Sequence, residues 1–213
     1  MRKLVLSLAL IGMTLIASAQ DIQLPKPQLE NKMTVMEALQ NRHSSREYSE
    51  KQITDSELST VLWASCGINR PESGKLTVPS AINAQDILVY VIRQDGAYLY
   101  QPKENILKKI CSKDLRTLVA GRQAFAATAP VSLVLVSNHT KFGKVQNAAE
   151  RLGVIDAGYV SQNICLACAA LGLNTVPRMT MDTEGLRKEL GLDTNYDIII
   201  NSQVGYPKAS EKC

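Results

Sequence analysis

The strongest constraint on the fold is one long helix, expected from about residue 146 to residue 171. Small side chains recur along it at spacings of three and four residues, and an apolar stripe runs beside them. We expect such a helix to be buried, with the small stripe allowing another helix to approach closely. The small stripe consists of Gly158, Ser161, Cys165, Cys168 and Gly172, and the apolar stripe of Val160, Ile164, Ala167 and Leu171.

The remaining chain mixes strands and helices without a regular alternation. Apolar, β-rich runs predict the strands, and Asp95-Gly96 marks a hairpin turn between two of them. The predicted strands cover residues 87–92, 97–100, 131–136, 174–177 and 196–203. Because no regular βαβ pattern connects them, the predicted class is α+β rather than doubly wound.

Two of the predicted helices begin with a capping box, in which Thr and Glu satisfy each other's free backbone N–H groups. These boxes are Thr34-x-x-Glu37 and Thr54-x-x-Glu57, and Gly67 ends the second helix. The predicted helices cover 34–41, 55–66 and 183–190, and residues 103–127 are expected to be helical with interruptions. Residues 69–83 are rich in Pro, Gly, Ser and Asn and predict a long loop, which in compact domains is usually functional.

The N-terminus has the parts of a secretory signal peptide. Arg2 and Lys3 precede an apolar run that ends in Ala17-Ser18-Ala19. The run is too short to cross a bilayer, and a buried N-terminal helix would leave the charged start unexplained. We therefore predict a signal peptide at 1–19, an extended arm at 20–32 and a single domain at 33–213, exported to the periplasm or secreted.

Charge and motifs exclude several classes of function. Removal of Arg2 and Lys3 lowers the formal charge from +4 to +2, and no block of like charges remains to bind nucleic acid or an anionic membrane. No later stretch is expected to be long and apolar enough to span a membrane, so we expect no membrane insertion after the signal peptide is removed. The chain has neither G-x-G-x-x-G after a strand nor G-x-x-x-x-G-K-[ST], which disfavours a dedicated dinucleotide fold and a P-loop.

The five cysteines have two competing interpretations. An odd number in an exported protein leaves at least one thiol unpaired within the chain. Cys165-x-x-Cys168 could be a redox pair, but its position within a helix among apolar neighbours favours two small core residues. His43 and His139 are the only histidines and there is no second Cys pair, so we predict no metal site.

Two constellations could bind a ligand. In Arg42-His43-Ser44-Ser45-Arg46 the alternate side chains of an extended chain would converge as a receptor for a phosphate or another planar anion. The alternative is a solvated basic loop between helices. In Pro79-Ser80-Ala-Ile-Asn83-Ala-Gln85 the amides offer donors and acceptors suited to a flavin pyrimidine ring, although such residues also fill ordinary loops.

Together these features resemble the nitroreductase family of FMN-dependent oxidoreductases, from about Met33 to Pro207. Arg-x-Ser-x-Arg at 42–46 and Pro-Ser-x-x-Asn-x-Gln at 79–85 resemble the two flavin motifs of that family. Residues 158–173 are similar to its long interface helix, and Val176-Pro177 and Gly205-Tyr-Pro207 match the end of its pattern. The resemblance implies a central mixed or antiparallel sheet flanked by helices, a long central dimer helix and a homodimer that binds FMN between its subunits.

The resemblance also implies the site residues. Arg42 and Ser44, with His43 between them, would hold the FMN phosphate, and Arg46 would lie near N1 and O2 of the ring. Ser80, Asn83 and Gln85 would face the ring and the ribityl chain. Pro177, Met179 and Thr180 would lie beside the isoalloxazine, with a backbone N–H near Met179 directed at N5. Some relatives carry an acidic residue at the Met179 position, and a basic residue near the family's C-terminus often contacts the phosphate, for which Lys208 and Lys212 are the candidates here.

The implied activity is a ping-pong cycle in which NADH or NADPH reduces FMN and a nitroaromatic or quinone then accepts the electrons. No side chain needs to act as nucleophile or acid. Because free nicotinamide nucleotides are scarce outside the cytoplasm, a non-catalytic flavin-binding or small-molecule-binding protein of the same fold is the alternative. A thiol oxidoreductase built on Cys165 and Cys168 is the third hypothesis.

Overall fold

The computed structural model describes residues 20–30 and 32–208. The predicted signal peptide, Lys212 and Cys213 lie outside the described residues.

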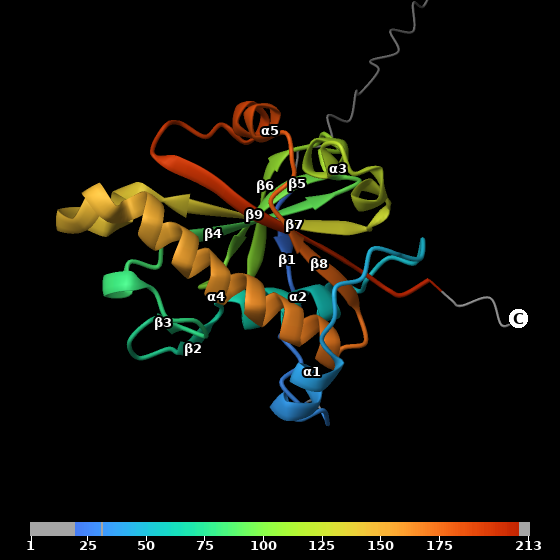
Figure 1. Ribbon diagram of the computed structural model, residues 1–213. Coiled ribbons are helices and arrows are strands. Elements are labelled where there is room, and N and C mark those ends of the chain that lie inside the picture. The colour runs from blue at the N-terminus through green and yellow to red at the C-terminus, as the bar shows by residue number, and fades with distance from the viewer. Residues whose placement is uncertain (1–19, 31, 209–213) are drawn as a thin grey trace, which may run out of the picture.

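A seven-stranded sheet forms the centre of the molecule, in the order β1-β6-β5-β4-β7-β9-β8, and each of its pairings is antiparallel (Figure 1). β7 is buried along its whole length, which explains why residues 131–136 are apolar except for Ser132. The strands are β1 (Ile22–Gln23), β4 (Ile87–Arg93), β5 (Gly96–Gln101), β6 (Ile106–Cys111), β7 (Val131–Asn138), β8 (Asn174–Arg178) and β9 (Tyr196–Gly205). The predicted arm supplies β1, which pairs with β6.

Helices cover both faces of this sheet (Figure 1). Alternate residues of β7 point to opposite faces, so Leu133 and Leu135 join one core and Val134 and Val136 the other. The first core packs against α2 (Asp55–Cys66) and α4 (Ala149–Ala170), and the second against α3 (Arg116–Ala120) and α5 (Thr183–Leu190). The α+β class with a long helix is therefore confirmed.

The predicted helix starts are confirmed at α1 (Val35–Asn41) and α2. Thr34 and Glu37 form one capping box, and Thr54 and Glu57 form the other. Gly67 does end α2, but its φ is −70° rather than left-handed. A Cβ there would lie 2.4 Å from Cδ1 of Trp63, so the helix ends in glycine because the Trp63 side chain lies too close for a larger residue.

The long helix divides its small residues between two faces. Ser161, Cys165 and Cys168 are buried, whereas Gly158 is exposed and Gly172 lies beyond the helix with φ of +67°. The close approach to the sheet occurs instead at Gly153, where a Cβ would lie 2.4 Å from Oγ of Ser137. By length and composition alone the helical segment His139–Ala170 is long and apolar enough to cross a membrane, which corrects the expectation that no later stretch would be; the core helices of soluble proteins pass the same test, and 44% of the apolar window in this segment is buried.

The prediction of helix across 103–127 is wrong for its first part, which forms β6. The register of β5 and β6 shifts between the pairs Ala97–Cys111 and Tyr98–Lys109, so one residue of β6 bulges out. This bulge breaks the alternation of apolar and polar residues that normally indicates a strand. The second part holds α3 and the short 3₁₀ helix η2 (Ala124–Thr128).

The predicted loop at 69–83 also contains regular structure. A two-stranded hairpin of β2 (Ile68–Arg70) and β3 (Lys75–Leu76) opens it, and the 3₁₀ turn η1 (Ala81–Asn83) closes it. Strands this short carry no periodicity that a sequence pattern could reveal.

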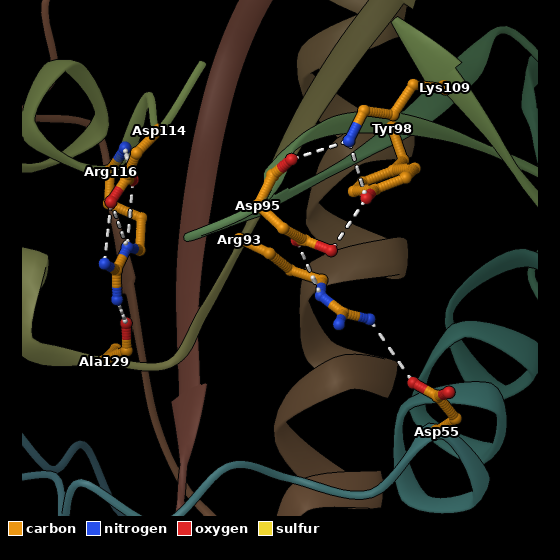
Figure 2. Close-up of polar contacts among 8 residues, drawn as sticks. All are labelled: Asp55, Arg93, Asp95, Tyr98, Lys109, Asp114, Arg116 and Ala129. Atoms are coloured by element: carbon orange, nitrogen blue, oxygen red, sulfur yellow. Dashed lines mark hydrogen bonds and ion pairs between the residues drawn. The ribbon is translucent and has the colours of Figure 1, made fainter. Parts of the chain in front are cut away.

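Two arginines, one near the β4–β5 turn and one at the start of α3, are paired with acidic groups (Figure 2). Arg93 lies 3.3 Å from a carboxylate oxygen of Asp55 and 3.2 Å from one of Asp95. Arg116 lies 2.7 Å from a carboxylate oxygen of Asp114. These pairs provide a contrast for the cations of the candidate site.

Candidate functional site

The Arg-x-Ser-x-Arg segment lies along the outer edge of β8. The backbone N–H of Ser45 donates to the carbonyl of Thr175 at 3.0 Å, and the Asn174 amide donates to the carbonyl of Glu47 at 2.8 Å. α1 ends at Arg42, whose φ of −60° and ψ of 118° turn the chain into this extended path. These contacts use the backbone of the segment and leave the side chains of Arg42, Ser44 and Arg46 free.

A cavity of about 720 Å³ lies between this segment and the C-terminal end of α4. Arg42, His43 and Ser45 line it from one side and Cys165 from the other, whereas Ser44 and Arg46 are exposed outside its lining. In one chain the expected convergence of residues 42, 44 and 46 is therefore not seen. Nδ1 of His43 lies 2.8 Å from the carbonyl oxygen of Asn41.

The side chains of Arg42, Ser44 and Arg46 make no hydrogen bond or ion pair with any part of the chain that the structure describes. Two guanidinium groups without a partner on one short segment contrast with the paired Arg93 and Arg116 (Figure 2). Planar, charge-assisted recognition of a phosphate or carboxylate is the chemistry that such free forks favour.

The thiols beside this cavity are buried. Burial raises the pKa of Cys165, although the nearby Arg42 charge lowers it in part, and burial also raises the pKa of Cys168. All four cysteines within the described residues are free thiols. Since nucleophilic cysteines need a lowered pKa, the geometry favours the interpretation of Cys165 and Cys168 as core residues.

The Pro-Ser-x-x-Asn-x-Gln loop lies elsewhere, against the N-terminal half of α4. The backbone N–H of Ala81 donates to both carboxylate oxygens of Asp156, at 3.1 and 2.9 Å. The Ser80 hydroxyl accepts from the N–H of Gln85 at 2.9 Å, and the Gln85 amide donates to the carbonyl of Gly74 at 3.0 Å. Asn83 is exposed to solvent.

This loop has an unusual backbone. Ile82, Asn83 and Gln85 have φ angles of 49°, 57° and 49°. Left-handed conformations outside glycine are uncommon and carry a free-energy cost of about 1–3 kcal/mol each, and they concentrate at functional sites.

Two buried carboxyl groups support the loop, and sequence reasoning missed both. Asp86 and Asp156 are almost inaccessible, and the Ser137 hydroxyl donates to Oδ2 of Asp86 at 2.6 Å. Burial, and then the neighbouring Asp86, raise the pKa of Asp156 to about 6, while the Ala81 N–H opposes the shift. Asp86 directly follows Gln85, so an acidic residue next to an amide motif was the available signal.

We expect the folded protein to lose stability as the pH rises through the range from the usual Asp pKa to about 6. A folded-state pKa above the unfolded value means that the folded protein binds the proton more tightly, so deprotonation favours unfolding. Between about pH 5 and about pH 7.5 this one group should lower the free energy of unfolding by about 1 kcal/mol. Asp156→Asn, which keeps an acceptor for the Ala81 N–H, should flatten this dependence in urea titrations.

The matched control for this prediction is Glu150→Gln, which removes an exposed carboxylate from the same helix. It should retain the pH dependence of the unmodified protein. An Asp156→Asn profile as steep as that of the control would contradict the assignment.

The third predicted group follows the end of β8. Pro177 is partly buried, whereas Met179 is 75% exposed, and Met179 and Thr180 line a second cavity of about 410 Å³ together with Arg122. Arg178, which lies between Pro177 and Met179 in the sequence, is a buried charged residue that the sequence analysis did not single out. A lone arginine within an otherwise buried strand was the available signal.

The structure brings the first and third groups together but not the second. β8 carries the contacts of the Arg-x-Ser-x-Arg segment at Asn174 and Thr175 and ends beside Pro177. The charges of Arg178 and Arg46 both lower the pKa of Tyr48, opposing the larger effect of burial. Both arginines therefore lie close enough to Tyr48 to interact with it electrostatically. The Ser80–Gln85 loop contacts α4 at Asp156, nine residues before Cys165 and hence about 13 Å along the helix.

Comparisons with known proteins match this architecture. The model of the nitroreductase family matches residues 39–206. A protein of Methanocaldococcus jannaschii, whose name describes it as a candidate nitroreductase, is 32% identical over 166 residues, which cover 73% of this chain and 82% of that protein.

Solved structures agree with the family match. A candidate nitroreductase from Ralstonia eutropha superposes with a TM-score of 0.84 at 31% identity, covering 90% of this chain and 92% of that one. The NADPH:FMN oxidoreductase of Vibrio harveyi, solved with NAD⁺, shares the fold at 18% identity with a TM-score of 0.62, covering 84% of this chain and 71% of that one. The chain belongs to the nitroreductase family of oxidoreductases.

Proposed function

We propose that the protein is an FMN-dependent oxidoreductase that passes electrons from NADH or NADPH to a small organic acceptor such as a nitroaromatic or a quinone, in a ping-pong cycle. The observation that carries this proposal is the unpaired guanidinium group of Arg42, which lines a cavity of about 720 Å³ and is followed four residues later by a second unpaired guanidinium group, Arg46. That volume lies within the range of small-molecule sites, roughly 300–1,000 Å³.

The residues present fit FMN. Arg42, Ser44 and His43 offer donors for the phosphate, and Arg46 offers a fixed cation for the pyrimidine edge of the ring. At the end of β8, Pro177 is partly buried and Met179 is exposed, and Met179 and Thr180 line a cavity of about 410 Å³ that offers room for the ring. When bound, FMN supplies the two-electron chemistry, and the protein supplies binding, orientation and electrostatics.

We further propose that a second copy of the chain completes each site. Large apolar side chains are exposed on α4 at Val154, Ile155 and Tyr159, and on α1 at Val35 and Met36. Exposed apolar groups gathered on adjacent elements are typical of interaction surfaces. If two α4 helices pack antiparallel about a two-fold axis, the N-terminal half of one lies beside the C-terminal half of the other. The Ser80–Gln85 loop of one chain would then face the Arg42 cavity of its partner.

Export to the periplasm or beyond the cell remains a proposal that rests on residues 1–19. It bears on the electron donor, because free nicotinamide nucleotides are scarce outside the cytoplasm.

The deciding experiment is an absorbance spectrum of the purified protein followed by anaerobic titration with NADH and with NADPH. We expect flavin bands, and bleaching of these bands by at least one nucleotide. Flavin that stays oxidised with both would favour the non-catalytic binding protein, and a colourless protein that takes up no added FMN would refute the proposal altogether.

A further inference from the structure

Arg178 is a buried cation held by five hydrogen bonds. Its side chain is 7% exposed. It donates to the side-chain oxygens of Gln123 at 2.7 Å and Asn201 at 2.9 Å. It also donates to the backbone carbonyls of Val119 at 3.3 Å, Ala120 at 2.8 Å and Thr180 at 2.9 Å.

All of these acceptors are neutral. None of the ion pairs found among residues 20–30 and 32–208 includes Arg178, and the Phe125 ring, 5.5 Å from the guanidinium carbon, completes its surroundings. Burial lowers the pKa of Arg178, but a guanidinium retains its proton in proteins. The five oxygens solvate this charge without neutralising it, and salt screens a buried charge much less than an exposed one.

The buried charge of Arg178 is adjacent in sequence to the residues that are candidates for contact with the flavin ring. Arg178 lies between Pro177 and Met179, and one of its hydrogen bonds fixes the carbonyl of Thr180. These are the residues that, under the proposed function, lie against the flavin ring. The uncompensated charge therefore lies directly behind the surface that would hold the ring.

We propose that Arg178 is a positioning residue that sets the reduction potential of the bound flavin: its buried, unpaired charge favours the reduced form, and its bond to Thr180 fixes the segment that faces the ring. This inference rests on the proposed function. A hydride that leaves NAD(P)H carries two electrons and one proton, so NAD(P)⁺ is released and one negative charge remains on a flavin that takes up no further proton. Arg178 stabilises that charge electrostatically.

The test compares the midpoint potential of bound FMN in the unmodified protein and in three variants. Arg178→Met removes the charge at similar volume, and Arg178→Lys retains it. Gln123→Glu leaves Arg178 in place and converts its 2.7 Å acceptor into a carboxylate of the same shape.

We expect Arg178→Met and Gln123→Glu each to lower the preference for reduced over oxidised FMN at least tenfold, a fall of about 30 mV or more for a two-electron couple. Arg178→Lys should lie close to the unmodified protein. Gln123 is exposed, so Gln123→Glu should fold even if Arg178→Met does not. A purely structural role would leave the potential of Gln123→Glu unchanged.

Equal potentials in the unmodified protein and in Gln123→Glu, both saturated with FMN, would overturn the inference while leaving the proposed function intact. Failure of the unmodified protein to bind FMN would instead refute the proposed function, and the inference with it.

Discussion

Replacing Arg42 with alanine is expected to remove most of the FMN from the purified protein. Arg42 lines the cavity and makes no ion pair within the described residues, so its guanidinium is free to bind a phosphate. A hydrogen bond to a charged group contributes about 1.5–3 kcal/mol, which corresponds to an affinity roughly ten-fold to a hundred-fold weaker. The flavin absorbance per chain after gel filtration, and fluorescence titration of the protein with FMN, measure this loss.

Arg93→Ala is the matched control, because it removes one guanidinium from a site that the structure explains fully. Arg93 pairs with Asp55 and Asp95 at the protein surface (Figure 2), where such pairs contribute about 0–1 kcal/mol. We expect Arg93→Ala to retain FMN at the level of the unmodified protein. Normal retention by Arg42→Ala would remove the main support for the phosphate site.

Gly158→Gln is expected to yield a monomer that binds FMN at least ten-fold more weakly. A Cβ at Gly158 meets nothing within 4 Å in the single chain, so the substitution leaves room for the fold itself. Gly158 lies on the exposed face of α4 next to Tyr159, where a second helix would have to approach closely. A long polar side chain there would separate the two helices and, with them, the two halves of each site. Analytical ultracentrifugation and FMN titration measure the two effects together.

Gly158→Ala provides the comparison at the same position. Alanine in a helix interior is more favourable than glycine by about 0.5–1 kcal/mol, so this variant should unfold at a higher urea concentration and remain a dimer. The dimer proposal would be wrong if Gly158→Gln stayed dimeric, or if the unmodified protein held FMN at full occupancy as a monomer.

The elements that the sequence predicted well are those whose stabilising contacts are local. The capping boxes at Thr34 and Thr54 join residues three apart, and helix α5 (Thr183–Leu190) has the predicted bounds. The strand at 131–136 could be predicted from its own apolar residues, without knowledge of the strands that pair with it. By contrast, β6 was missed because its bulge is defined only by pairing with β5, and Gly67 ends α2 through contact with the Trp63 ring.

The candidate site shows the same division. The residue types of the two candidate motifs were readable, because a guanidinium or an amide group has a chemistry that the local sequence displays. The partners of Asp156 and Arg178 were not readable, because Ala81 lies 75 residues from Asp156 and Val119 lies 59 residues from Arg178.

The sequence by itself therefore determined the class of the fold, the long helix and the family to which the chain is similar, since these depend on patterns within short windows and on their order. Only the tertiary structure decided that the Arg42 segment lies along β8 while the Ser80 loop contacts the N-terminal half of α4. Only the tertiary structure, too, decided that the Arg178 side chain is buried without a counter-ion next to Pro177 and Met179. The physical reason is that burial and pairing of charge arise from contacts between distant segments, which folding alone brings together.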